Sequence, residues 1–315
     1  VGNSPVMREV SRVIERIAPT TATVLINGES GTGKSLLARE IHRQSDRAKN
    51  SLVEVACGSL TESLLESELF GHSAGAFTGA TASRDGMFTR ADRGTIFLDE
   101  IATATSAMQV KLLRVLQDFS FEPVGGSETK QVDARVILAT HENLEELVCS
   151  GKFREDLFWR INVITIQLPP LRERREDIRP LAEQFLNNVM IKTRRNIDGF
   201  TDAAVDCLEA HHWPGNVREL RNAIERCVIL ETGEQIKPSS LPDFKVESRL
   251  GNSEPSGAKS DASLEEQLKE TERDIILQKL SATDFNIETA AETLQLKPHD
   301  LRYRMHQLKL ELDSD

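Results

Sequence analysis

The sequence predicts an α/β protein: a mostly parallel sheet with helices on both faces, followed by helical segments. Three observations support this prediction. Five short apolar runs alternate with amphipathic runs up to residue 168, which is the pattern of a parallel sheet with crossover helices. Pro169-Pro170 then ends the sheet region, and the pattern from 171 to 231 is helical. With 315 residues, the chain is long enough for two or three domains and a sizeable core.

The elements of the sheet region follow in order along the chain. A helix over residues 3–17 precedes the first strand. The expected strands are 23–27, 52–56, 94–100, 135–140 and 162–168. Between them, helices are expected at 36–42, 60–70, 107–119 and 153–160. Residues 121–132 contain Gly125-Gly126 and are expected to form a hairpin.

The stretch from Gly28 to Ser35 joins the first strand to a helix and fits the spacing G-x-x-x-x-G-K-[ST] at every fixed position. Its glycines let the backbone wrap closely around phosphate, and the following helix adds its positive N-terminal end. Lys34 is expected to reach the β and γ phosphates, and Ser35 to hold Mg²⁺. A glycine turn that binds nothing is the alternative, and the flanking strand and helix argue against it. The predicted nucleotide-binding residues of this loop are Gly28, Glu29, Ser30, Gly31, Thr32, Gly33, Lys34 and Ser35.

The strand over residues 94–100 ends in two carboxylates, Asp99 and Glu100. In a protein with a phosphate loop, Mg²⁺ and the attacking water are handled at this place. Asp99 is expected to act at the metal, and Glu100 to activate the nucleophilic water. An acidic turn without function is the alternative. Thr140 and His141 stand at the C-terminal end of another buried strand, and ligands of open α/β sheets lie outside these strand ends.

Residues 71–80 are mostly small and surround one large aromatic side chain, Phe77. Such a segment cannot build a core of its own, so an exposed, mobile loop is expected. An exposed Phe at a tip flanked by glycines indicates contact with a partner. The alternative, in which Phe77 folds back into the core, is equally compatible with the composition.

Composition and charge restrict the classes of function. The net charge of −11 excludes a general nucleic-acid binder, so any such contact must be local. No apolar run approaches the ~20 residues of a membrane span. The four cysteines lie far apart without a C-x-x-C pair, which suits a reducing cytosol and argues against zinc or a disulfide framework. Because the chain begins with Val1 rather than Met, we expect a fragment of a longer protein.

The helical segment begins with amphipathic helices at 178–191 and 201–210. Residues 213–220 are a turn that leads into a further helix. Asn216 is expected to cap that helix, with Glu219 completing a capping box and Arg218 held rigidly in the first turn. Residues 232–262 are rich in Ser, Pro and Gly and are expected to be a linker.

The last segment is expected to contain three short helices, at 264–280, 287–294 and 298–310. The tight turn before Pro298 is typical of a helix-turn-helix. Residues 297–310 carry a net charge of +3, from Asp300 and the bases Lys297, Arg302, Arg304 and Lys309. A basic helix on an acidic domain fits contact with phosphates and the major groove. A solvated helix pair used only for dimerisation is the alternative.

Six motifs occur in order: GESGTGKS, ELFGHSAGAFTGA, GTIFLDE, FREDLFWRINV, LPPLRERREDI and WPGNVREL. Through them the chain closely resembles the bacterial enhancer-binding proteins, the AAA+ activators of sigma-54 RNA polymerase, over nearly its whole length. The resemblance implies a P-loop AAA+ parallel sheet with helices on both faces, a helical lid subdomain and a small all-α helix-turn-helix domain. The implied bounds are 1–168 for the ATPase subdomain, 169–240 for the lid, 241–262 for a flexible linker and 263–315 for a Fis-type DNA-binding domain.

The resemblance also assigns residues. Arg154 and Arg160 match arginine fingers, which act with Asp99 and Glu100 in catalysis by reaching the γ-phosphate of a neighbouring subunit. Thr140 falls at the sensor I position, and Arg218 matches the sensor II arginine. The loop that touches sigma-54 would comprise Gly75, Ala76, Phe77, Thr78, Gly79 and Ala80, with residues 125–130 as a second surface loop. Helix 298–309 would read DNA through Lys297, His299, Arg302, Tyr303 and Arg304.

The implied function is ATP-dependent activation of transcription, with ATP and Mg²⁺ as cofactors. The implied partners are the sigma-54 RNA polymerase holoenzyme, double-stranded DNA at upstream enhancer sites, and further copies of the chain. These copies would form a hexameric ring, with a dimer at rest, in the cytoplasm and without membrane contact. Two alternatives remain. One is a DNA-binding regulator that uses ATP only as an assembly ligand, and the other is an AAA+ replication or protein-remodelling factor. The intact GAFTGA loop favours the sigma-54 activator.

Three positions depart from the family pattern. Ala56 stands where an Asn at the end of the second strand usually holds the catalytic Glu. His141 follows Thr140 where Asn is usual. Gln295 stands in the turn between the two DNA-binding helices, where Gly is usual. The first two departures bear on how hydrolysis is coupled to partner binding, and the third on the geometry of the turn.

Overall fold

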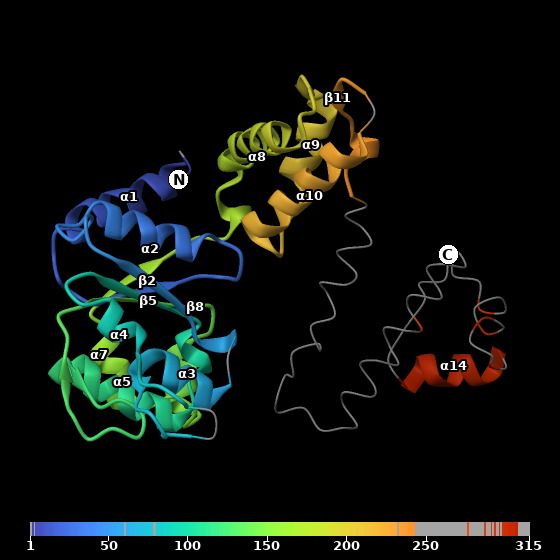
Figure 1. Cartoon of the computed structure of the whole chain (residues 1–315). Coiled ribbons are helices and arrows are strands. Elements are labelled where there is room, and N and C mark those ends of the chain that lie inside the picture. Colours follow the sequence, from blue (N-terminus) through green and yellow to red (C-terminus); the bar gives the residue numbers. More distant parts are fainter. Residues whose placement is uncertain are drawn as a thin grey trace. The chain divides into compact units, whose positions relative to one another are not determined.

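The computed structural model describes residues 2, 4–59, 61–77, 80–231 and 233–242, and in the C-terminal part residues 276, 287, 291, 293, 296 and 298–307. The chain divides into two compact units, Val1–Phe244 and Lys245–Asp315. The first unit holds a sheet, the helices that cover it and a further group of helices (Figure 1).

A five-stranded parallel sheet in the order β2-β5-β8-β1-β9 forms the centre of the first unit. Its strands are β1 (Val24–Asn27), β2 (Leu52–Ala56), β5 (Thr95–Asp99), β8 (Arg135–Thr140) and β9 (Ile164–Gln167). The predicted parallel sheet is therefore confirmed. Asn27 pairs with Thr140 and Ala56 with Asp99, so the carboxyl ends of these strands lie at one edge. The loops that follow the strands meet there.

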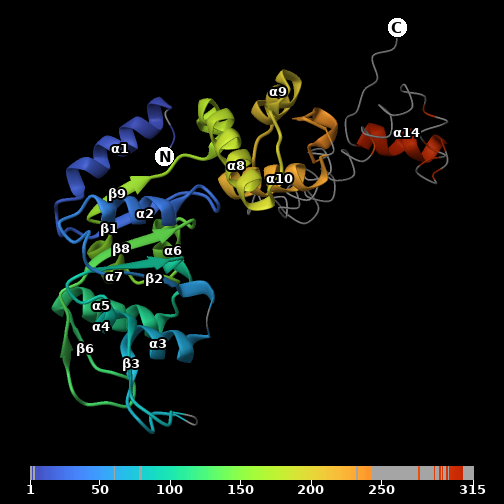
Figure 2. The same ribbon diagram turned by 45° about the horizontal axis from the view of Figure 1, so that its top comes forward.

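Helices cover both faces of the sheet (Figure 1, Figure 2). One face carries α1 (Pro5–Ile17) and α2 (Lys34–Arg43), and the other carries α3 (Glu62–Phe70), α4 (Met87–Arg90), α5 (Ser106–Asp118), α6 (Leu144–Cys149) and α7 (Glu155–Ile161). Successive strand residues point to opposite faces. Ile96 and Leu98 of β5 belong to the core with α3 and α5, whereas Phe97 packs with α1 and α2. The inner strands β1, β5 and β8 are buried along nearly their whole length, whereas the edge strands β2 and β9 also carry exposed residues, such as Glu54 and Thr165.

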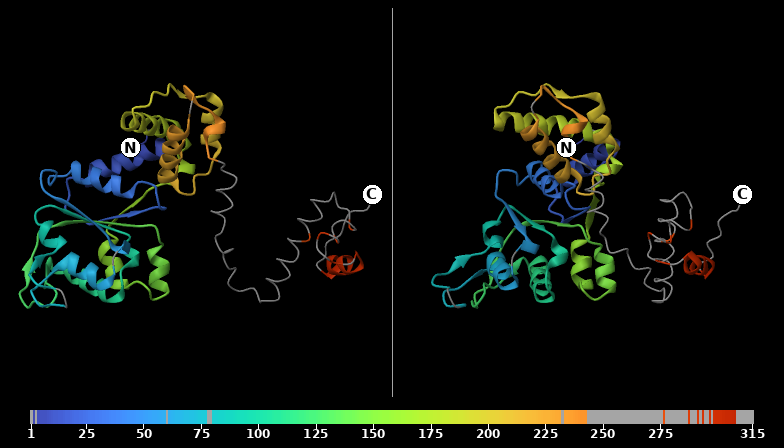
Figure 3. Two further views of the ribbon diagram at one scale, coloured as in Figure 1. Left: turned by 45° about the vertical axis from the view of Figure 1, so that its right-hand side comes forward. Right: turned by 90° about the vertical axis from the view of Figure 1, so that its right-hand side faces the viewer.

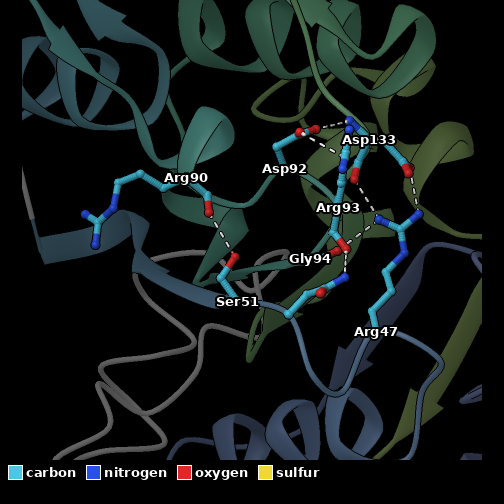
Figure 4. A network of polar contacts seen from close by, with 8 residues as sticks. Arg47, Ser51, Arg90, Asp92, Arg93, Gly94 and Asp133 are labelled. Carbon is cyan, nitrogen blue, oxygen red and sulfur yellow. Dashed lines mark hydrogen bonds and ion pairs between the residues drawn. The ribbon is translucent and has the colours of Figure 1, made fainter.

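A network of polar contacts stabilises the other edge of the sheet, at the N-terminal ends of β2, β5 and β8 (Figure 4). Arg47 donates to the carbonyl oxygens of Gly94 (3.1 Å) and Asp133 (2.6 Å), and its Nη2 donates to the Asp133 carboxylate (2.6 Å). Ser51 Oγ donates to the carbonyl oxygen of Arg90 (2.9 Å). These contacts join segments that are far apart in the sequence and align the strands that lead to the other edge.

Two short antiparallel pairs accompany the sheet: β3 (Gly71–His72) with β4 (Arg84–Asp85), and β6 (Ser120–Phe121) with β7 (Lys130–Gln131). The pair β6–β7 confirms the hairpin expected within residues 121–132. A bridge joins His72 to Val124, and the Ser73 N–H donates to the Val124 carbonyl oxygen (3.0 Å). The loop after β3 and the loop after β6 are therefore joined to each other.

Residues 171–242, called the lid from here on, form the second part of this unit. The lid contains η3 (Leu171–Glu173), η4 (Arg175–Asp177), α8 (Ile178–Thr193), β10 (Gly199–Phe200), α9 (Asp202–Ala210), α10 (Asn216–Leu230), β11 (Gln235–Ile236) and η5 (Pro238–Ser240). Its core surrounds Trp213, which is fully buried and donates from Nε1 to the Leu208 carbonyl oxygen (2.8 Å). Figure 3 shows its yellow and orange helices apart from the green helices beneath the sheet. Residues 235–240 belong to the lid rather than to a linker, because Ile236 is buried in its core.

The start of α10 differs from the prediction. Gly215 takes the cap position, and Asn216 is the first helical residue, with a φ of +53° and no exposed surface. The Asn216 side chain makes no capping hydrogen bond, since it contacts other segments. Only the return half of the capping box forms, in which the Glu219 carboxylate accepts the Gly215 N–H (2.7 Å). The prediction that Asn216 caps the helix was therefore wrong.

In the second unit, the structure describes α14 (Pro298–Gln307) and the buried residues Ile276, Ala291, Leu301 and Met305, which form a small cluster. The start of α14 at Pro298 agrees with the prediction. Residues 243–262 of the predicted linker and most of the helices 264–280 and 287–294 lie outside the described residues, as do Lys297, Gln295 and the side chains of Arg302 and Tyr303. No helix among the described residues combines the length and the apolar character that crossing a membrane demands.

Candidate nucleotide-binding site

The loop of residues 28–33 connects β1 to α2 at the carboxyl edge of the sheet. Gly31 has a φ of +79° and Gly33 a φ of +110°, values that favour glycine. Within the described residues, the backbone N–H groups of Ser30, Gly31 and Gly33 donate to no protein acceptor. Free N–H groups beside the N-terminus of α2 form the donor set that phosphate oxygens require. The loop therefore fits a bound phosphate chain.

Lys34 begins α2 and folds back over this loop. Its side chain is largely buried, and its Nζ donates to the carbonyl oxygens of Gly28 (2.7 Å) and Glu29 (3.0 Å). Burial lowers the pKa of Lys34, while the nearby carboxylates of Asp99 and Glu100 oppose that shift. An ammonium held only by neutral carbonyl oxygens can exchange them for phosphate oxygens, which carry charge.

Ser35 and Asp99 come together as predicted. Ser35 Oγ donates to Asp99 Oδ2 at 3.3 Å, and Asp99 Oδ1 accepts the Glu100 N–H at 3.0 Å. A hydroxyl and a carboxylate oxygen are ligands that suit Mg²⁺, which commonly takes few protein ligands and completes its shell with water and phosphate. The described residues contain no group of three or more His, Cys, Asp or Glu side chains suited to a metal. The residues present fit Mg²⁺ bound together with a nucleotide.

Glu100 lies just beyond β5 in the left-handed region, with a φ of +58°. Its carbonyl oxygen accepts the Thr103 hydroxyl (2.7 Å) in η2 (Ile101–Thr103), which holds the turn. Its carboxylate lies over Gly58 in η1 (Cys57–Ser59). A Cβ added to Gly58 would stand 2.5 Å from Glu100 Oε2. No pattern in the sequence indicates this close approach.

Burial, with the charges of Asp99 and Glu100, raises the pKa of Cys57 to about 12, so this thiol stays protonated.

A cavity of about 350 Å³ lies between the phosphate loop, the end of β5 and the lid. Lys34, Ser35, Asp99 and Glu100 line it from the sheet side, and Arg218 lines it from the lid. Sequence reasoning missed four further lid residues that line it: Phe185 of α8, and Val217, Arg221 and Asn222 of α10. Arg221 follows Arg218 by three residues and so shares its helix face, which is the signal that could have indicated it. Phe185 has no comparable signal.

The two sensor positions differ in their surroundings. The Thr140 side chain is fully buried, and its hydroxyl accepts the Glu142 N–H (3.0 Å). His141 is exposed and lines the cavity. Arg218, in the first turn of α10, donates from Nη1 to Ser30 Oγ (3.0 Å), so the lid contacts the phosphate loop directly.

Arg154 and Arg160 do not line this cavity. Arg154 precedes α7, and its guanidinium pairs with the Asp156 carboxylate through Nε (3.0 Å) and Nη2 (2.7 Å). Arg160 donates to the Leu116 carbonyl oxygen from Nε (2.9 Å) and Nη2 (2.5 Å). Neither guanidinium contacts the phosphate loop of its own chain.

The loop after β3 carries Phe77, whose side chain is 47% exposed. The ring packs edge-on against His72, with centroids 5.1 Å apart, so it is outside the core, and the exposed alternative is confirmed. The Gly75 N–H donates to the Ala80 carbonyl oxygen (2.8 Å), which closes the loop on itself. Thr78 and Gly79 lie outside the described residues.

Three protein-family models match the chain. The sigma-54 interaction domain matches residues 1–167, the AAA+ ATPase lid domain matches 172–258, and the bacterial regulatory protein Fis family matches 267–308. The chain belongs to the sigma-54 interaction domain family. As a member of this family it combines an AAA+ ATPase core, a lid and a Fis-type helix-turn-helix, which confirms the resemblance found in its motifs.

Individual members of the sigma-54 interaction domain family align with most of the chain. The transcriptional regulatory protein ZraR of Klebsiella oxytoca is 49% identical over 294 residues, which are 93% of this chain and 65% of ZraR. The response regulator protein PilR of Pseudomonas aeruginosa is 42% identical over 313 residues, 99% of this chain and 70% of PilR. The chain thus spans about two thirds of the length of these relatives.

Solved structures of similar proteins agree with the fold. The crystal structure of NtrX from Brucella abortus matches 98% of this chain and 69% of its own, with a TM-score of 0.73 and 35% identity. NtrX in complex with ATP matches with a TM-score of 0.69, 35% identity, and coverage of 98% and 68%. Hsp104 shares the fold at 19% identity and a TM-score of 0.53, over 71% of this chain and 44% of its own.

Proposed function

We propose that the chain is an ATPase that activates transcription by sigma-54 RNA polymerase from DNA sites upstream of the promoter. The observation that carries the proposal is the convergence of the phosphate loop, Asp99, Glu100 and Arg218 on one cavity, in a member of the sigma-54 interaction domain family that retains residues 75–80 as GAFTGA. ATP hydrolysis would move the GAFTGA loop and remodel the closed promoter complex.

At the site, each residue has a task that fits its surroundings. The free N–H groups of the loop and Lys34 would bind the β and γ phosphates. Ser35 and Asp99 would hold Mg²⁺, which supplies positive charge against the phosphate oxygens. Glu100, whose carboxylate accepts no hydrogen bond within the described residues, would accept the proton of the attacking water. Arg218 would leave Ser30 and bind the nucleotide from the lid side.

Hydrolysis would take place between subunits. Arg154 and Arg160 lie outside the cavity of their own chain, so they would act as arginine fingers on a neighbour in a ring, for which we propose six subunits, with a dimer at rest. Trp159 and Val163, at and just beyond the end of α7, are 65% and 60% exposed. Large exposed apolar side chains in the same short segment as the two arginines favour a surface that a neighbouring subunit covers.

Contact with sigma-54 would come from Gly75, Ala76, Phe77, Thr78, Gly79 and Ala80. The exposure of Phe77 supports this proposal, because a large aromatic ring half in solvent is suited to docking. Residues 125–130, as the second surface loop, would support the GAFTGA loop, since the chain around Val124 is bonded to the chain around Ser73.

The remaining parts of the proposal concern organisation. We propose the bounds 1–168, 169–240, 241–262 and 263–315 for the ATPase subdomain, lid, linker and DNA-binding domain. We also propose a cytoplasmic location, which the four free cysteines support.

Steady-state ATPase of the chain with and without sigma-54 tests the proposed function. A sigma-54 activator should hydrolyse ATP at a rate that changes when sigma-54 is added. A regulator that uses ATP only for assembly should bind ATP without turnover. A remodelling factor of another class should hydrolyse ATP at a rate that ignores sigma-54.

DNA binding would use the helix after Lys297, with contacts from Lys297, His299, Arg302, Tyr303 and Arg304. Among these, the side chains of His299 and Arg304 lie within the described residues and are exposed. Replacing Arg304 or Arg302 by Ala should weaken binding to all DNA sequences. If the replaced arginine binds a phosphate, the slope of log K against log salt should also fall by about one unit. Filter binding across a salt series measures this slope. An unchanged affinity of the variant that lacks both arginines would show that the helix does not contact DNA.

Ala56 bears on how the site is controlled. It ends β2 beside Asp99 and has no polar atom to restrain Glu100. A hydrogen bond to a charged group is worth about 1.5–3 kcal/mol, so Ala56→Asn should lower the basal ATPase rate by about tenfold or more. Addition of sigma-54 should then raise the rate further than it does in the parent chain.

His141 lines the same cavity, and its imidazole is able to provide the restraint that Ala56 lacks. The basal ATPase rate of Ala56→Asn is therefore compared with that of Ala56→Asn combined with His141→Asn. If Ala56→Asn has the basal ATPase rate of the parent chain and sigma-54 stimulates both equally, a group other than residue 56 couples sigma-54 binding to ATP hydrolysis.

A further inference from the structure

The outer side of the phosphate loop is bound by the lid along residues 29–32. Among the loop's carbonyl oxygens, those of Ser30, Gly31 and Thr32 each accept a hydrogen bond from a lid residue, at distances from 2.8 to 3.3 Å. The donors are the Asn216 side chain, the backbone N–H groups of Val217 and Arg218, and the Arg174 guanidinium. Because these carbonyl groups face the lid, the free N–H groups of the same loop are left for a ligand.

Glu29 is the centre of this contact. Its carboxylate accepts two parallel hydrogen bonds from Arg172, Nη1 to Oε2 at 2.8 Å and Nη2 to Oε1 at 2.6 Å. Asn216 Nδ2 adds a third, to Oε2 at 3.0 Å. The paired fork geometry fixes the direction of the carboxylate as well as its distance. Glu29 therefore faces the lid with its side chain, although it belongs to the predicted nucleotide-binding loop.

Asn216 is held from several sides. It is fully buried, its Oδ1 accepts the Leu171 N–H (2.7 Å), and its Nδ2 reaches both Glu29 and the Ser30 carbonyl oxygen (3.0 Å). Its φ of +53° is uncommon outside glycine, and such a conformation persists where the surroundings determine it. This one side chain thus ties the entry of the lid, the start of α10 and the phosphate loop together.

The loop and the lid also meet backbone to backbone. A Cβ on Gly31 would stand 2.3 Å from the Gly215 carbonyl oxygen, so the approach depends on glycine at this position. A shift of the lid would therefore displace the phosphate loop, and a shift of the loop would displace the lid.

We propose that Arg172 and Asn216 are positioning residues for nucleotide binding, which hold Glu29 and the Ser30 carbonyl so that the loop keeps its N–H groups directed at phosphate. The proposal rests on the proposed function, because it takes the ligand to be a nucleotide. Neither residue touches the reacting atoms. Their loss should raise the dissociation constant for nucleotide while leaving kcat close to that of the parent chain.

The test is a reciprocal exchange of charge, read out with a fluorescent ADP analogue on the full chain. Arg172→Glu and Glu29→Arg should each raise the dissociation constant by about tenfold, since each breaks a bidentate charged pair. The double variant should recover at least half of that loss on a logarithmic scale, because the pair is restored in reverse. In ATP turnover, KM should rise in the single variants with kcat within about twofold of the parent.

Arg179→Glu is the matched control, since Arg179 pairs with Glu183 on the lid at 3.0 Å and is exposed. It should bind the analogue like the parent chain. Glu29→Gln, which keeps the size and an acceptor oxygen, should give an intermediate affinity and guards against misfolding of the charge-reversed variants.

Parent-like affinity in both single variants would overturn the proposal. So would a loss that the double variant does not recover, because Arg172 would then act on the nucleotide itself or only on the fold. If the parent chain binds no nucleotide, the proposed function fails, which is a different result from parent-like single variants.

Discussion

Replacing Glu100 by Gln should stop ATP turnover and leave ATP binding intact. The substitution keeps the volume of the side chain and removes the carboxylate that we propose accepts a proton from water. General-base catalysis typically contributes about 10²–10⁴ in rate, so kcat should fall by at least two orders of magnitude. Single-turnover hydrolysis and binding of a fluorescent nucleotide, measured on the same variant, separate the two quantities. Hydrolysis at the parent rate would show that Glu100 is not the base.

Gly58→Ala provides a second approach to the same carboxylate. The added Cβ would stand 2.5 Å from Glu100 Oε2, which is too close for contact, so the carboxylate must move. We expect kcat to fall with the dissociation constant for nucleotide unchanged, because Gly58 does not line the cavity. Lys34→Ala should give the contrasting pattern, since it removes a group that we propose binds phosphate and should weaken nucleotide binding itself.

Replacing Arg154 or Arg160 by Ala should also abolish hydrolysis, and here the loss should be recoverable in mixed assemblies. An arginine finger supplies about 10³–10⁵ in rate. Subunits with Arg154→Ala retain an intact Glu100, and subunits with Glu100→Gln retain both arginines. Mixing the two kinds of subunit should create interfaces in which one supplies the base and its neighbour the finger, so activity should rise above that of either alone.

The mixing ratio provides the control for this experiment. Activity should pass through a maximum between the two pure samples, and mixed assembly is verified by energy transfer between labelled subunits. Absence of recovery at every ratio, in samples where mixed assemblies are verified, would contradict catalysis between subunits. An arginine finger that acts within its own chain would have to reach the cavity of that chain. In this structure, Arg154 instead binds Asp156, and Arg160 binds the Leu116 carbonyl oxygen.

The parts of the fold that the sequence predicts are those that depend on local pattern. The inner strands of the sheet are buried on both faces, so β5 and β8 are recognisable as mostly hydrophobic runs. The phosphate loop is recognisable because its chemistry demands particular residues at fixed spacing. Asp99 and Glu100 are predictable as site residues because they stand at the end of a recognisable strand. Parallel strands have their carboxyl ends at one edge of the sheet, which is where ligands bind.

The parts that the sequence does not predict depend on partners distant in the chain. Asn216 has the residue type and the spacing of a helix cap, yet its side chain bonds Leu171 and Glu29, which lie 45 and 187 residues away. Sequence rules for helix caps take no account of buried contacts with residues that are distant in the chain. Glu29 similarly belongs to the nucleotide-binding motif while its carboxylate pairs with Arg172. The close approach of Gly58 to Glu100 is a matter of packing alone.

The central claim is that hydrolysis of ATP by this chain drives sigma-54 polymerase from the closed to the open promoter complex. The direct measurement is permanganate reactivity of promoter thymines in the presence of the chain, sigma-54 holoenzyme and promoter DNA. We predict that thymines near the start site become reactive with ATP, and stay unreactive with a non-hydrolysable analogue or with Glu100→Gln. Reactivity that appears equally with the analogue, or no reactivity under conditions where the chain hydrolyses ATP, would contradict the account.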